Sequence, residues 1–79
     1  MNKMRLKDLR DMYPEGTTVQ VEHMEDPHPV PYGTLGKVTH VDDAGQIHVS
    51  WDNGSSLALI PGTDEFHIVA YTSKRNDNE

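Results

Sequence analysis

Two short turn sequences, each ending in glycine, constrain the fold of this chain more than any other feature. Asp43-Ala44-Gly45 and Asp52-Asn53-Gly54 separate three runs, 37–42, 46–51 and 55–60, in which apolar and polar residues alternate. Alternation with a period of two predicts half-buried β-strands. A three-residue loop with glycine in the left-handed third position predicts a tight hairpin. The segment 37–60 is therefore predicted to form a three-stranded antiparallel meander.

The turn type also predicts which residues face each other. It pairs residue 42 with 46 and residue 51 with 55, so Val41 should oppose Ile47. By the same register Ile47 also opposes Leu59, and Val49 opposes Leu57. The face predicted to be buried then carries Val41, Ile47, Val49, Trp51, Leu57 and Leu59. A two-residue Asn-Gly turn would instead turn both leucines outward, so burial favours the three-residue form.

The rest of the chain supplies the remaining elements. Residues 18–23 and 66–70 are predicted strands, and 24–36 is predicted to be a long, stiff, ordered loop because it holds Pro27, Pro29, Pro31, Gly33 and Gly36. Residues 3–12 have apolar residues near helical spacing and are followed by Pro14 and Gly16, which predicts a short amphipathic helix. So short a helix gains stability by packing. We expect it to cap one open end of the following barrel, and the alternative is that its Leu and Met residues face a partner.

This order of elements predicts a mainly β protein: a small SH3-like five-stranded barrel with a short N-terminal helix. Closing a small sheet in this way protects its edges. We expect residues 1–13 to form the amphipathic helix, 15–70 the barrel, and 71–79 a polar, disordered tail. A chain of 79 residues allows one domain with one modest core.

Composition limits the classes of function. The chain has no Cys, which excludes disulfides and thiol catalysis, and we expect a cytoplasmic protein without a secretory signal or membrane span. The formal net charge is −6, and residues 13–69 hold a single cation, Lys37, against nine acids. An acidic body repels phosphate backbones, so this composition argues against general nucleic-acid binding. The basic residues of the helix are the exception, with Lys3, Arg5, Lys7 and Arg10.

Several motifs together resemble a known family. They are Tyr13-Pro14-Glu15-Gly16-Thr17, Pro31-Tyr32-Gly33-Thr34-Leu35-Gly36-Lys37-Val38, the stretch from Val41 to Leu57, Ile60-Pro61-Gly62 and Asp64-Glu65-Phe66. From about residue 5 to residue 69 the chain resembles domain of unknown function 4314, whose members are small bacterial and phage proteins, often from mobile elements. The resemblance implies a context but no activity. It also shows one departure, because the family pattern has a second proline where this chain has Tyr32.

A further likeness concerns only the fold. Residues 33–38 and the Trp51-Asp52-Asn53-Gly54 segment look like KOW and Tudor-like small barrels, which share this architecture with many unrelated functions.

The sequence contains few residues in patterns that would support catalysis or metal binding. The acids sit at turns, where Asp bonds nearby backbone N–H groups, and no serine has a nucleophile elbow or phosphate-binding glycines. We therefore predict a non-enzyme without cofactor or small-molecule substrate. The register makes His40 and His48 a cross-strand pair with Asp42 on the same face, a minor candidate for a metal site that lacks a fourth ligand. Two charged imidazoles in such a pair should repel each other below about pH 6.5.

The preferred function is a protein-interaction module. If Tyr32 folds over Trp51, the two rings form a shallow apolar groove for a basic or proline-rich segment of a partner. The residues predicted to line it are Tyr32, Trp51, Asp52, Asn53, Asp26 and Asp64. One alternative is nucleic-acid binding through Lys3, Arg5, Lys7 and Arg10. Another is an acidic inhibitor that mimics DNA and acts on a host defence protein.

Overall fold

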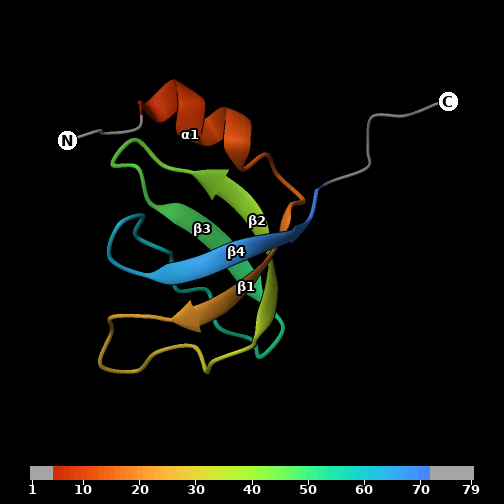
Figure 1. Ribbon diagram of the computed structural model, residues 1–79, viewed down its shortest axis with the longest axis vertical. Coiled ribbons are helices and arrows are strands. Elements are labelled where there is room, and N and C mark those ends of the chain that lie inside the picture. The colour runs from red at the N-terminus through yellow and green to blue at the C-terminus, as the bar shows by residue number, and fades with distance from the viewer. Residues whose placement is uncertain (1–4, 72–79) are drawn as a thin grey trace, which may run out of the picture.

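Four strands and one helix make up the part of the protein that the computed structural model describes, residues 5–71. In chain order they are α1 (Leu6–Met12), β1 (Thr18–His23), β2 (Leu35–Val41), β3 (Ile47–Trp51) and β4 (Glu65–Ala70). The strands form one antiparallel sheet in the order β3-β2-β1-β4 (Figure 1). The protein is mainly β with one short helix, as predicted.

The predicted five-stranded closed barrel is wrong. Residues 55–60 contribute one isolated bridge, Ile47 with Leu59, in place of a full strand. Two side chains explain the difference. The Ser55 hydroxyl accepts a hydrogen bond from the Leu57 amide at 3.2 Å, and the Leu57 carbonyl accepts one from Trp51 Nε1 at 2.9 Å. These bonds occupy backbone groups that a ladder with β3 would need, so the strand does not propagate.

The predicted turns and the pairs next to them are confirmed, but a register shift between Val38 and His40 moves the rest of the β2–β3 ladder by one residue. Val41 pairs with Ile47, and the Trp51 amide donates to the Ser55 carbonyl at 3.0 Å. Gly45 and Gly54 have φ of 84° and 91°, the left-handed conformation that this turn requires. The core contains Val41, Ile47, Val49, Trp51 and Leu59 as predicted, while Leu57 is only half-buried against it.

The long loop is shorter than predicted and is tied to the core. β2 begins at Leu35, two residues before the predicted strand, because Leu35 and Gly36 pair with Gln20 and Val19 of β1. Gly36 belongs in the strand because it is closely packed: a Cβ there would lie 2.7 Å from Trp51 Cε3. Within the loop, Met24 and Val30 are buried, which supports the expectation of an ordered segment.

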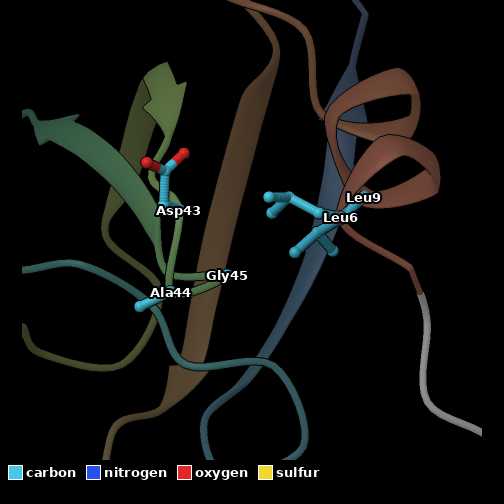
Figure 2. Close-up of a pocket in the computed structure, with 5 residues that line it drawn as sticks. All are labelled: Leu6, Leu9, Asp43, Ala44 and Gly45. Carbon is cyan, nitrogen blue, oxygen red and sulfur yellow. The ribbon is translucent and has the colours of Figure 1, made fainter.

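Helix α1 packs on the sheet at the β2–β3 turn (Figure 1). It begins at Leu6, later than predicted, because Arg5 has an extended backbone with φ −73° and ψ 154°. Leu9 is buried in the core, and Figure 2 shows Leu6 and Leu9 pointing toward the turn at Asp43, Ala44 and Gly45. The expected role as a cap therefore fits this packing. Of the predicted tail, 71–79, residues 72–79 lie outside the described residues, as do residues 1–4.

Helix α1 is also too short to cross a bilayer. Over residues 5–71, no helix is long and apolar enough for that.

Candidate functional site

A tight turn at the end of the long loop displays Tyr32. The Thr34 amide and hydroxyl both donate to the Pro31 carbonyl, at 3.1 and 2.7 Å, and Gly33 has φ of 88°. A bond from the fourth residue to the first, with a positive φ at the third, is typical of a type II turn. Proline, glycine and threonine thus fix the backbone on both sides of the tyrosine.

The turn is joined to β1 by three further hydrogen bonds. The Gly33 amide donates to the Val21 carbonyl at 2.8 Å, and the Val21 amide donates to the Thr34 carbonyl at 3.1 Å. The side chain of Gln20 donates from Nε2 to the Gly33 carbonyl at 3.0 Å. Yet the Tyr32 side chain is 82% exposed. A backbone held this firmly therefore projects a tyrosine that packs against almost nothing.

The predicted groove between Tyr32 and Trp51 is wrong. Trp51 is only 3% exposed, its Nε1 donates to the Leu57 carbonyl, and its ring packs over Gly36. A side chain as exposed as Tyr32 does not cover it. Trp51 therefore belongs to the core, where burial of a large aromatic ring is strongly stabilising, and it offers no surface to a partner.

Asp64 also has an internal role. It is 6% exposed, and its two carboxylate oxygens accept hydrogen bonds from the amides of Glu25 at 2.8 Å and Ile60 at 2.7 Å. The carboxylate thus ties the segment before β4 to the end of β1. Asp64 therefore stabilises the fold, and its buried carboxylate does not belong to a binding surface.

The other three predicted residues are exposed. Asp26 and Asn53 each cap a local turn, by accepting from the amides of His28 at 2.9 Å and Ser55 at 3.0 Å. The Asp52 amide donates to the Leu35 carbonyl at 2.8 Å, which places Asp52 beside the strand that follows the Tyr32 turn.

Leu35 is a surface residue that the sequence analysis missed. It is exposed, starts β2 directly after Thr34, and lies on the face of the strand opposite the buried Gly36 and Val38. The alternation from residue 35 to residue 38 could have revealed it, but the prolines and glycines of 24–36 predict a loop up to Gly36. We take the exposed residues Tyr32, Leu35, Asp52 and Asn53 together as the candidate surface, here called the Tyr32 surface.

The predicted histidine pair exists. His40 and His48 are cross-strand neighbours whose rings stack with centroids 4.3 Å apart and planes 8° apart. Asp42 Oδ2 lies 2.8 Å from His48 Nε2, while Oδ1 accepts from the amides of Ala44 and Gln46. The hydrogen bond with His48, followed by that from Gln46, lowers the pKa of Asp42 from its ordinary 3.8. Among residues 5–71, no three His, Cys, Asp or Glu side chains are arranged to hold a metal ion, this trio included.

Two further histidine–carboxylate pairs lie on β1 and its neighbours. His23 Nε2 is 2.7 Å from Glu25 Oε2, and His67 Nδ1 is 2.7 Å from Glu22 Oε2. The hydrogen bond and the charge of Glu25 raise the pKa of His23 above its ordinary 6.5. The spacing of His23 and Glu25 could have suggested the first pair. The second required knowledge that β4 pairs with β1.

A family model matches residues 2–69, nearly the whole chain, and it is described as a domain of unknown function, DUF4314. The chain belongs to this family. The predicted resemblance is confirmed, and the description of the family names no activity. Neither a curated protein nor a solved structure matches the chain.

Two of the four predicted basic residues of this DUF4314 protein, Lys7 and Arg10, lie close to acids. Lys7 lies 3.7 Å from Asp11, and Arg10 lies 2.9 Å from Asp43. Arg10 Nε also donates to the Val41 carbonyl at 3.2 Å, which joins α1 to the β2–β3 hairpin. Arg5 is exposed at the start of α1, and Lys3 lies outside the described residues.

Two small hollows lie beside α1. The first, of about 160 Å³, lies between α1 and the β2–β3 turn and is lined by Leu6, Leu9, Asp43, Ala44 and Gly45 (Figure 2). The second, of about 230 Å³, is lined by Arg10, Tyr13, Pro14, Glu15, Thr39, His40 and Val41. Both are smaller than pockets for drug-sized ligands, which measure roughly 300–1,000 Å³. Neither contains a residue of the Tyr32 surface.

Proposed function

We propose that this protein is a non-enzymatic interaction module that binds a protein partner through the Tyr32 surface. The observation that carries the proposal is the 82% exposure of Tyr32 on a turn whose backbone is fixed by hydrogen bonds on both sides. The proposal replaces the predicted groove, because Trp51 and Asp64 lie inside the fold. It keeps Tyr32, Asp52 and Asn53 and adds Leu35.

An exposed tyrosine on a fixed turn suits a binding site because it lowers the energetic cost of binding. An exposed tyrosine brings a large apolar ring and a hydroxyl group, and it has few rotatable bonds to immobilise. Tyrosine is accordingly enriched among the residues that contribute most to interface affinity. A preformed turn also lowers the entropy that is lost when a loop becomes ordered on binding. In the free protein this ring buries almost no surface and contributes little to folding.

Charge suggests the chemistry of the partner. Asp52 lies beside Leu35, and Asp26 is exposed in the same loop as Tyr32. Residues 13–69 carry one cation against nine acids. A basic segment next to an aromatic or apolar contact is therefore the complementary surface, since opposite potentials favour encounter and register. We include in the proposal a cytoplasmic location in a bacterium or phage-infected cell, without cofactor or small-molecule substrate.

Capture of partners from a bacterial lysate tests this proposal. The full chain is used as bait at low and high salt, with and without nuclease, beside Tyr32→Ala and Tyr71→Ala. Tyr71 is the matched control because it is also highly exposed, at 63%, but follows β4. We expect a stoichiometric protein that survives nuclease and is lost only with Tyr32→Ala. A partner bound equally by all three chains, or recovery abolished by nuclease, would overturn the proposal.

Nucleic-acid binding through the helix is the competing proposal. Its support is weaker because Lys7 and Arg10 already face Asp11 and Asp43. With four phosphate contacts, the logarithm of the binding constant should fall with the logarithm of the salt concentration with a slope of about −3 to −4. A binding constant that does not change with salt would argue against nucleic-acid binding. The proposed mimicry of DNA is weaker still, since Asp42, Asp43 and Asp64 serve contacts within the fold.

A further inference from the structure

Strand β4 is an edge strand whose second side is open. Its ladder with β1 includes three consecutive pairs, in which Phe66, His67 and Ile68 face Val21, Gln20 and Val19. In the described part of the chain no strand pairs with the other side of β4. Nor do its residues 66–70 form any backbone hydrogen bond outside the sheet. Within residues 5–71 the outer edge of β4 therefore has no backbone partner.

Protecting side chains are sparse along β4, although register shifts interrupt its ladder with β1 at Val69 and opposite Glu22. Natural edge strands are commonly blunted by lysine, proline, an inward-pointing charge or a bulge, because an unprotected edge pairs with other chains. Residues 65–70 are Glu-Phe-His-Ile-Val-Ala, without proline, lysine or arginine and with one formal charge at the first position. Val69 is 51% exposed in this strand. An open and mostly apolar edge of this kind is the acceptor in β-strand addition.

The side chains around the edge indicate what it would accept. Phe66 and Ile68 are half-buried against the core, so they leave apolar surface beside every second residue of an added strand. Glu65 begins β4 opposite His23, and Glu22 contacts His67. With Glu25 paired to His23, three glutamates surround the Glu65 end of the strand. A basic segment would complement these acids.

We infer that the free edge of β4 accepts an extended segment of a partner protein as an added antiparallel or parallel strand. The segment is apolar at alternate residues and carries lysine or arginine next to Glu65 and Glu22. This inference rests on the proposed interaction function but places a second contact on a different part of the molecule. Backbone hydrogen bonds supply the affinity, and the pattern of apolar and basic side chains supplies the selectivity.

Selection from a displayed library of random 12-residue peptides tests the inference on the full chain. Enriched peptides are synthesised, and their affinities are measured by fluorescence anisotropy for the wild type, Val69→Lys, Val69→Thr and Tyr32→Ala. Val69→Lys places a positive charge on the edge, while Val69→Thr is the matched control that stays β-branched and uncharged. A far-UV circular dichroism spectrum and melting curve establish that each variant folds.

The expected peptides are basic with alternating apolar residues. Their affinity falls at least about tenfold with Val69→Lys, since a like charge at an interface is strongly unfavourable, and stays unchanged with Val69→Thr and Tyr32→Ala. They also slow hydrogen exchange of amides in 66–70. The same peptides N-methylated at alternate amides should lose binding to the wild type, a result that does not depend on any protein variant.

Each other outcome overturns the inference. One such outcome is that the selection enriches no peptide. Another is that the affinity of the enriched peptides changes neither with Val69→Lys nor with N-methylation. A third is that bound peptide slows hydrogen exchange only at amides outside 66–70. Peptides that require Tyr32 but not Val69 would leave the Tyr32 surface standing and remove the β4 edge. A wild-type dimer in light scattering that Val69→Lys dissociates would make a second copy the occupant, and the basic partner would be excluded.

Discussion

His40 and His48 stack face to face across β2 and β3, with ring centroids 4.3 Å apart. Stacked rings that face each other across two strands are a cross-strand pair of the kind that stabilises a sheet. Asp42 contacts only one of the two rings, His48, at 2.8 Å. The carboxylate therefore fixes the orientation of His48, against which His40 stacks.

Removing one ring of this stack should lower stability. We expect His40→Ala to destabilise the protein by about 0.5 kcal/mol, since cross-strand side-chain pairs contribute roughly 0.2–1 kcal/mol. Urea unfolding measures the difference. His28→Ala is the control, because His28 is also exposed but lies in the loop. An equal free energy of unfolding for His40→Ala and His28→Ala would contradict the prediction.

The lowered pKa of Asp42 predicts a loss of folding stability at acid pH. Its folded pKa is lowered from 3.8, first by the hydrogen bond with His48, so the unfolded state binds the proton more readily. Its contribution to stability is therefore complete above pH 3.8 and is lost as the pH falls through the lowered value. Asp42→Asn removes this contribution, so its curve should be lower at neutral pH and flatter in acid, meeting the wild type below that transition.

Urea midpoints from pH 5 to pH 2 check this sign, with Asp52→Asn as the control at an exposed acid of the second hairpin. A wild-type curve that runs parallel to that of Asp42→Asn through this range would show that Asp42 is not linked to folding.

The hairpin turns were predictable because their signals are local. A glycine at the third position of each turn fixes the pairing of Val41 with Ile47, and burial on one face then selects Leu59 over Ile60. Residues 55–60 alternate as predicted but do not form a strand. The side chains of Ser55 and Trp51 hydrogen-bond the backbone amide and carbonyl of Leu57, which a ladder with β3 would need. Such side-chain competition depends on three-dimensional position, and periodicity does not report it.

The candidate site shows the same division. Pro31, Gly33 and Thr34 predict a turn, so an exposed Tyr32 follows from the sequence. The sequence correctly places Trp51 on the buried face. The predicted groove requires Tyr32 to fold back over it, which the turn geometry opposes. Asp64 looked like any turn aspartate. Only the two amides that converge on it, from residues 25 and 60, distinguish it from the exposed Asp26 and Asp52.

A side chain at position 36 should cause a steric clash without backbone strain. A Cβ at this position would lie 2.5 Å from Val49 Cγ1, 2.7 Å from Trp51 Cε3 and 2.9 Å from the Ser50 carbonyl oxygen. Gly36→Ala should therefore destabilise the protein by about 2–3 kcal/mol, in the range for overpacking of a core. Thermal unfolding with near-ultraviolet circular dichroism of Trp51 measures both the loss and the displacement of the ring.

Gly54→Ala is the informative comparison for Gly36. Nothing lies within 4 Å of its added Cβ, but its φ is 91°. The cost there is conformational and should be about 1 kcal/mol, with the Trp51 signal unchanged. A larger loss for Gly54→Ala than for Gly36→Ala would mean that the sheet relaxes around residue 36.

Asp64 predicts the largest effect of a single polar side chain. Asp64→Ala leaves the amides of Glu25 and Ile60 without their acceptor in a nearly buried position. An unsatisfied buried group costs about 1–3 kcal/mol, so we expect a loss of about 2–4 kcal/mol for the pair. Asp64→Asn keeps one carbonyl oxygen as acceptor and should cost about half as much.

Chemical unfolding of Asp64→Ala, Asp64→Asn and Asp26→Ala separates this role from an ordinary turn cap. Asp26 accepts one amide bond, from His28, in an exposed loop, where water replaces a lost acceptor. Its removal should cost no more than about 0.5 kcal/mol, as for surface substitutions generally. Because Asp64 holds the segment that leads into β4, its loss should also speed hydrogen exchange of the β4 amides before global unfolding. If Asp64→Ala were as mild as Asp26→Ala, the two converging hydrogen bonds would not be what fixes β4 on β1.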